Sequence, residues 1–125
     1  MNLNTYKILV VDDDEKILEQ IEQNYTKQGF NVVCQNSATR ALNYLSYNSD
    51  KVDLILLDQL MPEMNGVELI ENLSSSDINI PIIMMSGERE YSFVIQTISP
   101  KIHDFVPKPI DYSELDGKIE RTLQD

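Results

Sequence analysis

Several side chains with the chemistry to handle a phosphoryl group stand directly after short apolar runs. They are Asp12, Asp13, Asp58, Ser86 and Lys108. Three carboxylates crowded together repel one another unless a cation is present, and an all-oxygen site with few protein ligands suits Mg²⁺. A lysine and a hydroxyl opposite the carboxylates would supply a point charge and a hydrogen-bond donor for phosphoryl oxygens. The set therefore favours phosphoryl chemistry, with Asp58 as the natural nucleophile for an aspartyl phosphate.

Taken one at a time, these residues have simpler explanations. The acidic run 12–15 could cap a helix, which we expect Asp14 to do in any case. Ser86 could begin a turn, Lys108 could be a solvated surface lysine, and Asp58 could be an aspartate that ends a strand and begins a turn. It is their joint placement that favours a site.

The elements that position these side chains alternate along the chain. Short apolar runs predict strands at 7–11, 31–35, 52–57, 81–85 and 103–107. Apolar residues at helical spacing predict helices over 17–25, 38–45, 67–73, 91–98 and 112–123, with Ser37 as a cap and Gly29 ending the first helix. No hairpin signal separates the strands, so an α/β fold with a parallel sheet covered on both sides is expected. In such a sheet the ligand site lies at the carboxyl ends of the strands, where the five side chains stand.

Length and charge limit the classes of function. A chain of 125 residues has the size of one domain, so we expect a single domain over 1–125. A net charge of -11 argues against a nucleic-acid or anionic-membrane surface, because phosphates would be repelled. The single Cys34 lies in an apolar stretch and suits a small core residue in a reducing compartment. No secretory signal or long apolar run is visible, so we expect a cytoplasmic protein.

Four segments, in this order, resemble the receiver domains of two-component response regulators. They are KILVVDDDE, DLILLDQLMPEMNGVEL, PIIMMSG and DFVPKPID, and the resemblance covers essentially the entire chain. It implies a flavodoxin-like, doubly wound (βα)5 fold whose five-stranded parallel sheet has the strand order 2-1-3-4-5. It also implies a domain that accepts a phosphoryl group from a histidine kinase or a histidine phosphotransfer protein.

The resemblance also implies roles for single residues at the site. Asp58 matches the phosphoacceptor, and Asp12 and Asp13 match the acidic pair that holds Mg²⁺ together with Asp58. Leu60 matches a position whose backbone carbonyl reaches the metal, so its side chain is not needed for that role. Lys108 matches the lysine that pairs with the phosphoryl group.

The resemblance also implies two switch residues and one cis proline. Ser86 matches the hydroxyl that bonds the phosphoryl group, and Phe105 matches an aromatic residue that swings inward when the hydroxyl moves. Pro109 matches a proline that is usually cis. The surface formed by the fourth helix, fifth strand and fifth helix would then change partners, through homodimerisation or binding of an effector. From the residues alone, Phe105 is equally well explained as a buried strand residue.

Two other functions are weighed against this switch. The same fold could serve as a static docking or dimerisation module that needs no phosphorylation, although the intact set of carboxylates, serine and lysine disfavours it. An enzyme is disfavoured too. Flavin or dinucleotide binding lacks a glycine-rich loop after the first strand, and an aspartyl-phosphate phosphatase would carry a second aspartate where Leu60 stands.

Overall fold

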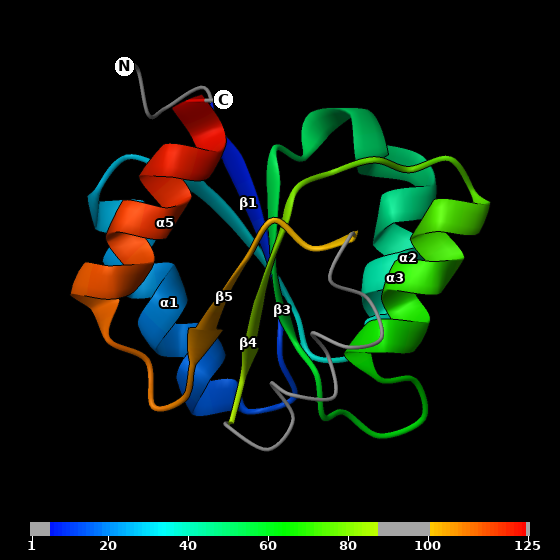
Figure 1. Cartoon of the computed structure of the whole chain (residues 1–125), viewed down its shortest axis with the longest axis horizontal. Coiled ribbons are helices and arrows are strands. Elements are labelled where there is room, and N and C mark those ends of the chain that lie inside the picture. Colours follow the sequence, from blue (N-terminus) through cyan, green and yellow to red (C-terminus); the bar gives the residue numbers. More distant parts are fainter. Residues whose placement is uncertain (1–5, 88–100, 125) are drawn as a thin grey trace.

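The computed structural model describes residues 6–87 and 101–124 (Figure 1). In chain order its elements are β1 (Lys7–Val11), α1 (Glu15–Lys27), β2 (Asn31–Gln35), α2 (Ala38–Asn48), the 3-10 helix η2 (Ser49–Lys51), β3 (Leu54–Asp58), α3 (Gly66–Ser75), β4 (Ile82–Ser86), β5 (Asp104–Pro107) and α5 (Tyr112–Gln124). All five predicted strands are present, as are four of the five predicted helices. The helix predicted over 91–98 lies outside the described residues.

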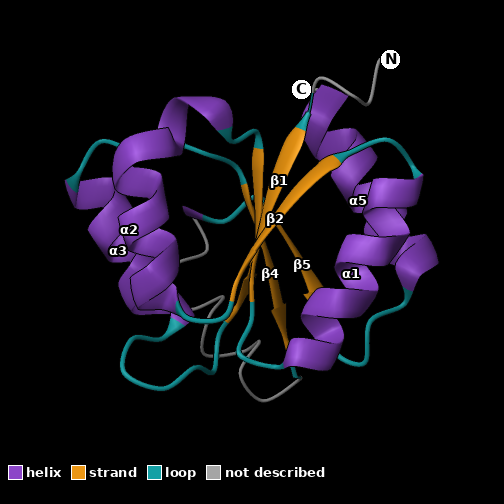
Figure 2. Cartoon of the chain, turned by 180° about the vertical axis from the view of Figure 1, so that it is seen from behind, coloured by secondary structure: helices purple, strands orange, loops and turns teal. Residues whose placement is uncertain are grey.

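The strands form one parallel sheet in the order β2-β1-β3-β4-β5, which confirms the order that the resemblance implied. Helices α1 and α5 cover one face of this sheet, and α2 and α3 cover the other (Figures 1 and 2). Parallel neighbours need crossover connections, and among the described residues α1, α2 and α3 lie in the connections from β1 to β2, from β2 to β3 and from β3 to β4. The fold is therefore the predicted doubly wound α/β arrangement, and it brings the carboxyl ends of all five strands to one edge.

Alternate residues of the central strands belong to two apolar cores, one on each face of the sheet. Ile8 and Val10 of β1 pack with residues of α1 and α5. Leu9 and Val11 pack with residues of α2 and α3. All residues of β3 and β4 are buried, which is why these strands appear in the sequence as unbroken apolar runs without polar alternation.

Side chains that satisfy free backbone N–H groups set where the helices begin. The Asp14 carboxylate accepts hydrogen bonds from two N–H groups of α1, and the Ser37 hydroxyl accepts one from α2, as predicted. Asn65 and Glu68 form a reciprocal capping box at the start of α3. Gly29, with a φ of 101°, follows the end of α1 in the left-handed region. Each side-chain cap stabilises its helix by about 1 kcal/mol.

Three strands differ from their predicted bounds by one or two residues, and one of them, β5, begins at Asp104, one residue after the predicted start. β3 begins at Leu54 and not at Val52. Asp53, just before it, makes two hydrogen bonds with the backbone of Lys7: its carboxylate accepts the Lys7 N–H at 2.7 Å, and its own N–H donates to the Lys7 carbonyl at 2.9 Å. β4 is shifted by one residue and includes Ser86. The single turn η2 was not predicted. Within 6–87 and 101–124, no helix has the length and apolar character needed to cross a bilayer.

Candidate functional site

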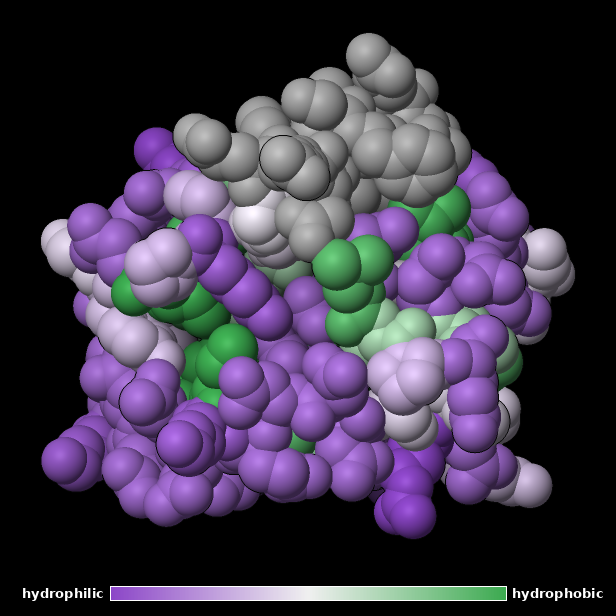
Figure 3. Space-filling model, turned by 90° about the horizontal axis from the view of Figure 1, so that it is seen from below, coloured by the Kyte–Doolittle hydropathy of each residue, from purple (hydrophilic) through white to green (hydrophobic). Residues whose placement is uncertain are grey.

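Four strands deliver polar side chains to the carboxyl-terminal edge of the sheet. Asp12 follows β1, Asp58 and Ser86 are the last residues of β3 and β4, and Lys108 follows β5. The parallel register aligns these ends, since Asp58 lies beside Met85 and the next residue of β4, Ser86, lies beside Pro107. Figure 3 views the molecule from this side, and its described surface is mostly hydrophilic. The topology thus gathers residues that are up to 96 positions apart.

Three carboxylates converge at this edge. One oxygen from each of Asp12, Asp13 and Asp58 lies within 4.8 Å of the others. Asp12 and Asp58 are buried, with 0% and 4% of their surface exposed, whereas Asp13 is exposed. Oδ1 of Asp12 also accepts the backbone N–H of Asp14 at 2.9 Å, which fixes the orientation of its carboxylate. Two negative charges are therefore held away from water and a third lies at the mouth of the site.

Lys108 is the cation that joins the two buried carboxylates. Its Nζ lies 2.7 Å from Oδ2 of Asp12 and 3.1 Å from Oδ1 of Asp58. The lysine side chain is 23% exposed, so its ammonium group reaches the carboxylates from the rim of the site. The peptide bond between Lys108 and Pro109 is cis. This lysine partly neutralises a pair of charges whose burial would otherwise be costly.

The environment shifts the pKa values of the two partners at the centre of the site. Burial, with the negative charge of Asp12, raises the pKa of Asp58 to about 6, against the lowering effect of Lys108. For Lys108, burial lowers the pKa, but the hydrogen bond to Asp12 and the charge of Asp58 outweigh that effect and the pKa is raised. At pH 7 Asp58 is therefore ionised and Lys108 is protonated, which is the combination that a nucleophile and its ion-pairing partner require.

The residues at this edge fit a hard divalent cation. Three carboxylate oxygens converge on one point, and Mg²⁺ prefers oxygen ligands of this kind. The hydroxyl of Ser86 is buried and has no hydrogen-bond partner in the described part of the chain. An unpaired buried hydroxyl next to ionised groups is available to donate to an incoming oxygen ligand. Asp12, Asp13 and Asp58 are the residues that would hold the metal.

The remaining predicted residues lie around this centre. Leu60 comes two residues after the end of β3, and its side chain is 59% exposed. Phe105 is a buried residue of β5, and its backbone carbonyl accepts a hydrogen bond from the Lys118 side chain of α5. Lys118 also contacts Asp104 at 3.5 Å, so α5 is tied to β5 at the position next to Phe105.

Gln59 and Gly66 shape the loop after the phosphoacceptor candidate, and sequence reasoning missed both contacts. Gln59 is 3% exposed, and its side-chain oxygen accepts the N–H of Val67 at 3.0 Å. Gly66 donates its N–H to the Gln59 carbonyl at 3.0 Å. A side chain at Gly66 would lie 2.8 Å from the carbonyl oxygen of Asp58. The available signal was the Asn65 and Glu68 spacing of a capping box, which places a helix start here but does not show what the start packs against.

Comparison with known proteins gives consistent matches. The family model described as "Response regulator receiver domain" matches residues 8–120. The heme response regulator HssR of Staphylococcus saprophyticus is 35% identical over 116 residues, which cover 93% of this chain and 50% of HssR. The regulatory protein AtoC of Escherichia coli is 30% identical over 118 residues, which cover 94% of this chain and 25% of AtoC.

A solved structure agrees with these relatives. The receiver domain of the Francisella response regulator 1452 superimposes with a TM-score of 0.85 and 27% identity, and the match covers 95% of this chain and 97% of that one. The chain spans half or less of the two curated relatives, so their other segments have no counterpart in these 125 residues.

Proposed function

This chain belongs to the response regulator receiver domain family of two-component systems, and on that premise we propose that it is a phosphorylation switch whose phosphoacceptor is Asp58. The donor is a histidine kinase or a histidine phosphotransfer protein. Receiver domains are signalling domains, and the proposed reaction is one transfer to the chain itself, without turnover of an external substrate. Because such donors act inside the cell, we place the protein in the cytoplasm.

The observation that carries the proposal is the position of Lys108 between Asp12 and Asp58. The lysine ammonium contacts both buried carboxylates, at 2.7 and 3.1 Å. A surface salt bridge with no function would not need two desolvated aspartates at strand ends. The buried, unpaired hydroxyl of Ser86 stands at the end of the neighbouring strand β4 and is free to donate a hydrogen bond to a phosphoryl oxygen.

In the proposed transfer, an oxygen of Asp58 forms a bond to phosphorus while the bond from phosphorus to the donor imidazole nitrogen breaks. The imidazole keeps the bonding electron pair and takes up a proton. Lys108 pairs with the phosphoryl oxygens and Ser86 donates a hydrogen bond to one of them. Mg²⁺, held by Asp12, Asp13, Asp58 and the backbone carbonyl of Leu60, would offset the negative charge brought together at the site.

We further propose that the switch acts through Ser86 and Phe105. Movement of the Ser86 hydroxyl toward a phosphoryl oxygen would free space that the Phe105 ring enters from β5. The surface that includes β5, α5 and the helix predicted over 91–98 would then exchange partners, by forming a homodimer or by binding an effector. The link between Lys118 and the Phe105 carbonyl supports this proposal, because it couples α5 to the backbone of β5.

The first test is intact mass after incubation with a small-molecule phosphodonor such as acetyl phosphate. We expect the wild type to gain one phosphoryl group in the presence of Mg²⁺ and none after chelation. Asp58→Asn should gain none under either condition, because an amide oxygen is a poor nucleophile. The modification should also disappear on mild alkaline treatment, as acyl phosphates hydrolyse readily.

Asp50→Asn is the matched control, since it removes one exposed carboxylate elsewhere in the chain and should be phosphorylated as the wild type is. Phosphoryl addition that persists in Asp58→Asn would move the phosphoacceptor to another residue. No addition to any variant would support the static docking function, in which partner affinity does not depend on phosphorylation.

Mg²⁺ is expected to stabilise the wild type and to stabilise Asp13→Asn much less. A ligand that binds only the folded state at tenfold its Kd adds about 1.4 kcal/mol to the free energy of unfolding. Asp13 is exposed, so its replacement should leave the fold intact while removing one oxygen charge from the site. Urea denaturation with and without Mg²⁺ measures the gain. If Mg²⁺ stabilises the wild type and Asp13→Asn equally, the metal binds elsewhere. Glu71→Gln on α3 is the control for the loss of one surface charge, and Mg²⁺ should stabilise it as much as the wild type.

A further inference from the structure

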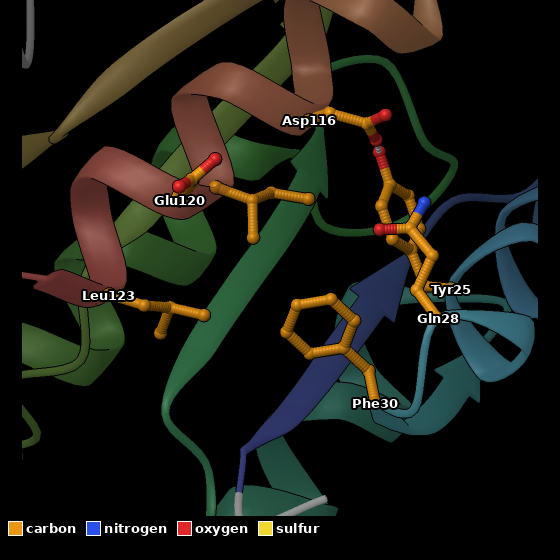
Figure 4. A pocket seen from close by; sticks show the side chains of 7 residues that line it. Tyr25, Gln28, Phe30, Asp116, Glu120 and Leu123 are labelled. Carbon is orange, nitrogen blue, oxygen red and sulfur yellow. Dashed lines mark hydrogen bonds between the residues drawn. The ribbon is translucent and has the colours of Figure 1, made fainter. Parts of the chain in front are cut away.

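A hollow lies at the opposite edge of the sheet from Asp58, between the C-terminal parts of α1 and α5 (Figure 4). Its volume is about 390 Å³, which is within the usual size range of small-molecule sites. Its lining residues are Tyr25, Gln28, Phe30, Asp116, Ile119, Glu120 and Leu123. Phe30 immediately precedes β2, so the hollow is at the amino ends of the strands, and none of its lining residues belongs to the proposed phosphorylation site.

One part of the lining is apolar. Phe30 and Leu123 extend toward one another across the hollow, from the segment before β2 and from the last turn of α5 (Figure 4). Ile119, buried one turn earlier on α5, adds to this surface. The Phe30 ring is held in place by an edge-to-face contact with Tyr25, with ring centroids 5.8 Å apart. The apolar wall is therefore a preformed surface for a hydrocarbon group.

The other part of the lining carries negative charge without a cationic partner. The Asp116 carboxylate accepts a hydrogen bond from the Tyr25 hydroxyl at 2.7 Å, and Glu120 follows one turn later on the same helix. Burial and the bond to Asp116 raise the pKa of Tyr25, so the phenol stays a neutral donor. No lysine, arginine or histidine of residues 6–87 and 101–124 forms an ion pair with either carboxylate.

The nearest cations on α5 are already engaged elsewhere. Lys118 pairs with Glu114 at 3.1 Å and contacts Asp104, and Arg121 lies 3.8 Å from Asp104. These pairs belong to the side of α5 that faces β5. Neither basic residue lines the hollow. The carboxylates at the hollow are thus left to attract a cation from outside the described chain.

We propose that this hollow binds an organic cation, a protonated amine or a guanidinium carried on an apolar body. The charged group would lie between Asp116 and Glu120, and the apolar body would pack against Phe30, Ile119 and Leu123. A free amine and an arginine side chain of a partner protein share this chemistry. An inorganic cation would leave the apolar wall unused. A neutral apolar ligand would leave the two carboxylates, which among the described residues accept hydrogen bonds only from the neutral Tyr25 and Gln124 side chains, without a counter-charge.

The test is a titration of isotope-labelled protein followed by the backbone amide signals of Gln28, Phe30 and Leu123. With 2-phenylethylammonium we expect these signals to shift with a Kd of about 1 mM. The neutral 2-phenylethanol and the small ethylammonium ion should each bind at least about fivefold more weakly, because each lacks one half of the required chemistry. A second arm uses acetyl-phenylalanyl-arginine amide, and tighter binding of this peptide would identify a protein partner as the source of the cation.

Glu120→Gln is the informative variant, because Glu120 is exposed and its replacement should not disturb folding. Glu120→Gln should raise the Kd for 2-phenylethylammonium about threefold to fivefold. Glu71→Gln on α3 removes the same charge elsewhere and should leave this Kd unchanged. The proposal is overturned if neither cation shifts these signals at several millimolar, if the neutral analogue binds equally well, or if both variants behave alike. All titrations use the unphosphorylated protein, so a failure of this proposal is distinguishable from a failure of the proposed phosphorylation of Asp58.

Discussion

Gly66→Ala is expected to lower the free energy of unfolding by about 3 kcal/mol, which is a large effect for a single added methyl group. A Cβ atom at this position would lie 2.8 Å from the carbonyl oxygen of Asp58, 2.9 Å from Oε1 of Gln59 and 3.2 Å from its Cα. Real Cβ atoms do not come so close to other atoms, so a neighbour has to move. Two of the three neighbours are backbone atoms, and Asp58 is fixed by its pairing with β4.

The measurement is urea denaturation of both proteins, and the chain supplies a matched control. Gly117 lies within α5, and a Cβ atom there would meet nothing within 4 Å. Gly117→Ala should therefore stabilise the protein by about 0.5 to 1 kcal/mol, through the better helix propensity of alanine. If Gly66→Ala costs less than about 0.5 kcal/mol, the loop after β3 adapts easily and the close packing described above does not constrain it.

Replacing Asp58 by asparagine is expected to stabilise the metal-free protein at pH 7 by about 2 kcal/mol. Burial and the neighbouring Asp12 raise the pKa of Asp58 from 3.8 to about 6 in the folded state. A pKa that is higher by one unit corresponds to about 1.4 kcal/mol of free energy. The expected increase in the free energy of unfolding is smaller than the full pKa difference implies, because Lys108 reaches the site from its partly solvated rim. Asparagine fills nearly the same volume without the charge.

The sign of this effect sets its pH dependence. Because the folded-state pKa is the higher one, the folded state binds more protons between about pH 4 and 6, and stability from this group falls as the pH rises through that range. The advantage of Asp58→Asn should thus be absent below about pH 4, grow up to about pH 6 and stay constant above it.

Denaturation curves of wild type and variant in chelator, taken across this pH range, measure the difference directly. Asp50→Asn, at an exposed position in η2, should differ from the wild type by less than about 0.5 kcal/mol at every pH. An advantage of Asp58→Asn that is independent of pH would mean that the Asp58 carboxylate is not destabilised by its surroundings. Saturating Mg²⁺ should reduce the advantage, because the metal stabilises only the protein that retains the carboxylate.

Together, Gly66→Ala and Asp58→Asn distinguish residues that stabilise the carboxyl-terminal edge of the sheet from residues proposed to carry out chemistry there. A protein that is stabilised by loss of a residue proposed for function shows a conflict between stability and activity, which is usual at functional sites. Asp58 is expected to show that conflict. Gly66 is expected to contribute to stability only, because the absence of a side chain lets the start of α3 pack against the backbone of Asp58.

Much of this protein is determined by local features of its sequence. Short apolar runs such as KILVV favour buried strands, and Asp14 and Ser37 cap helices with their own side chains. The absence of hairpin signals favours a parallel sheet. Because all strands of such a sheet end at one edge, the candidate site residues could also be collected from the sequence, as the residues that follow each strand. The strand order came from resemblance to a family, since periodicity does not say which strands are neighbours.

Other properties were decided by the tertiary structure alone, because they depend on distances between residues far apart in the chain. Lys108 bridges Asp12 and Asp58 only once β5 lies beside β4, and the raised pKa of Asp58 follows from burial that no local pattern encodes. The contact of the Asp53 carboxylate with the N–H of Lys7, 46 positions away, is also a property of the folded chain. The hollow between α1 and α5 likewise exists only because two helices with unrelated sequences pack side by side on the same face of the sheet.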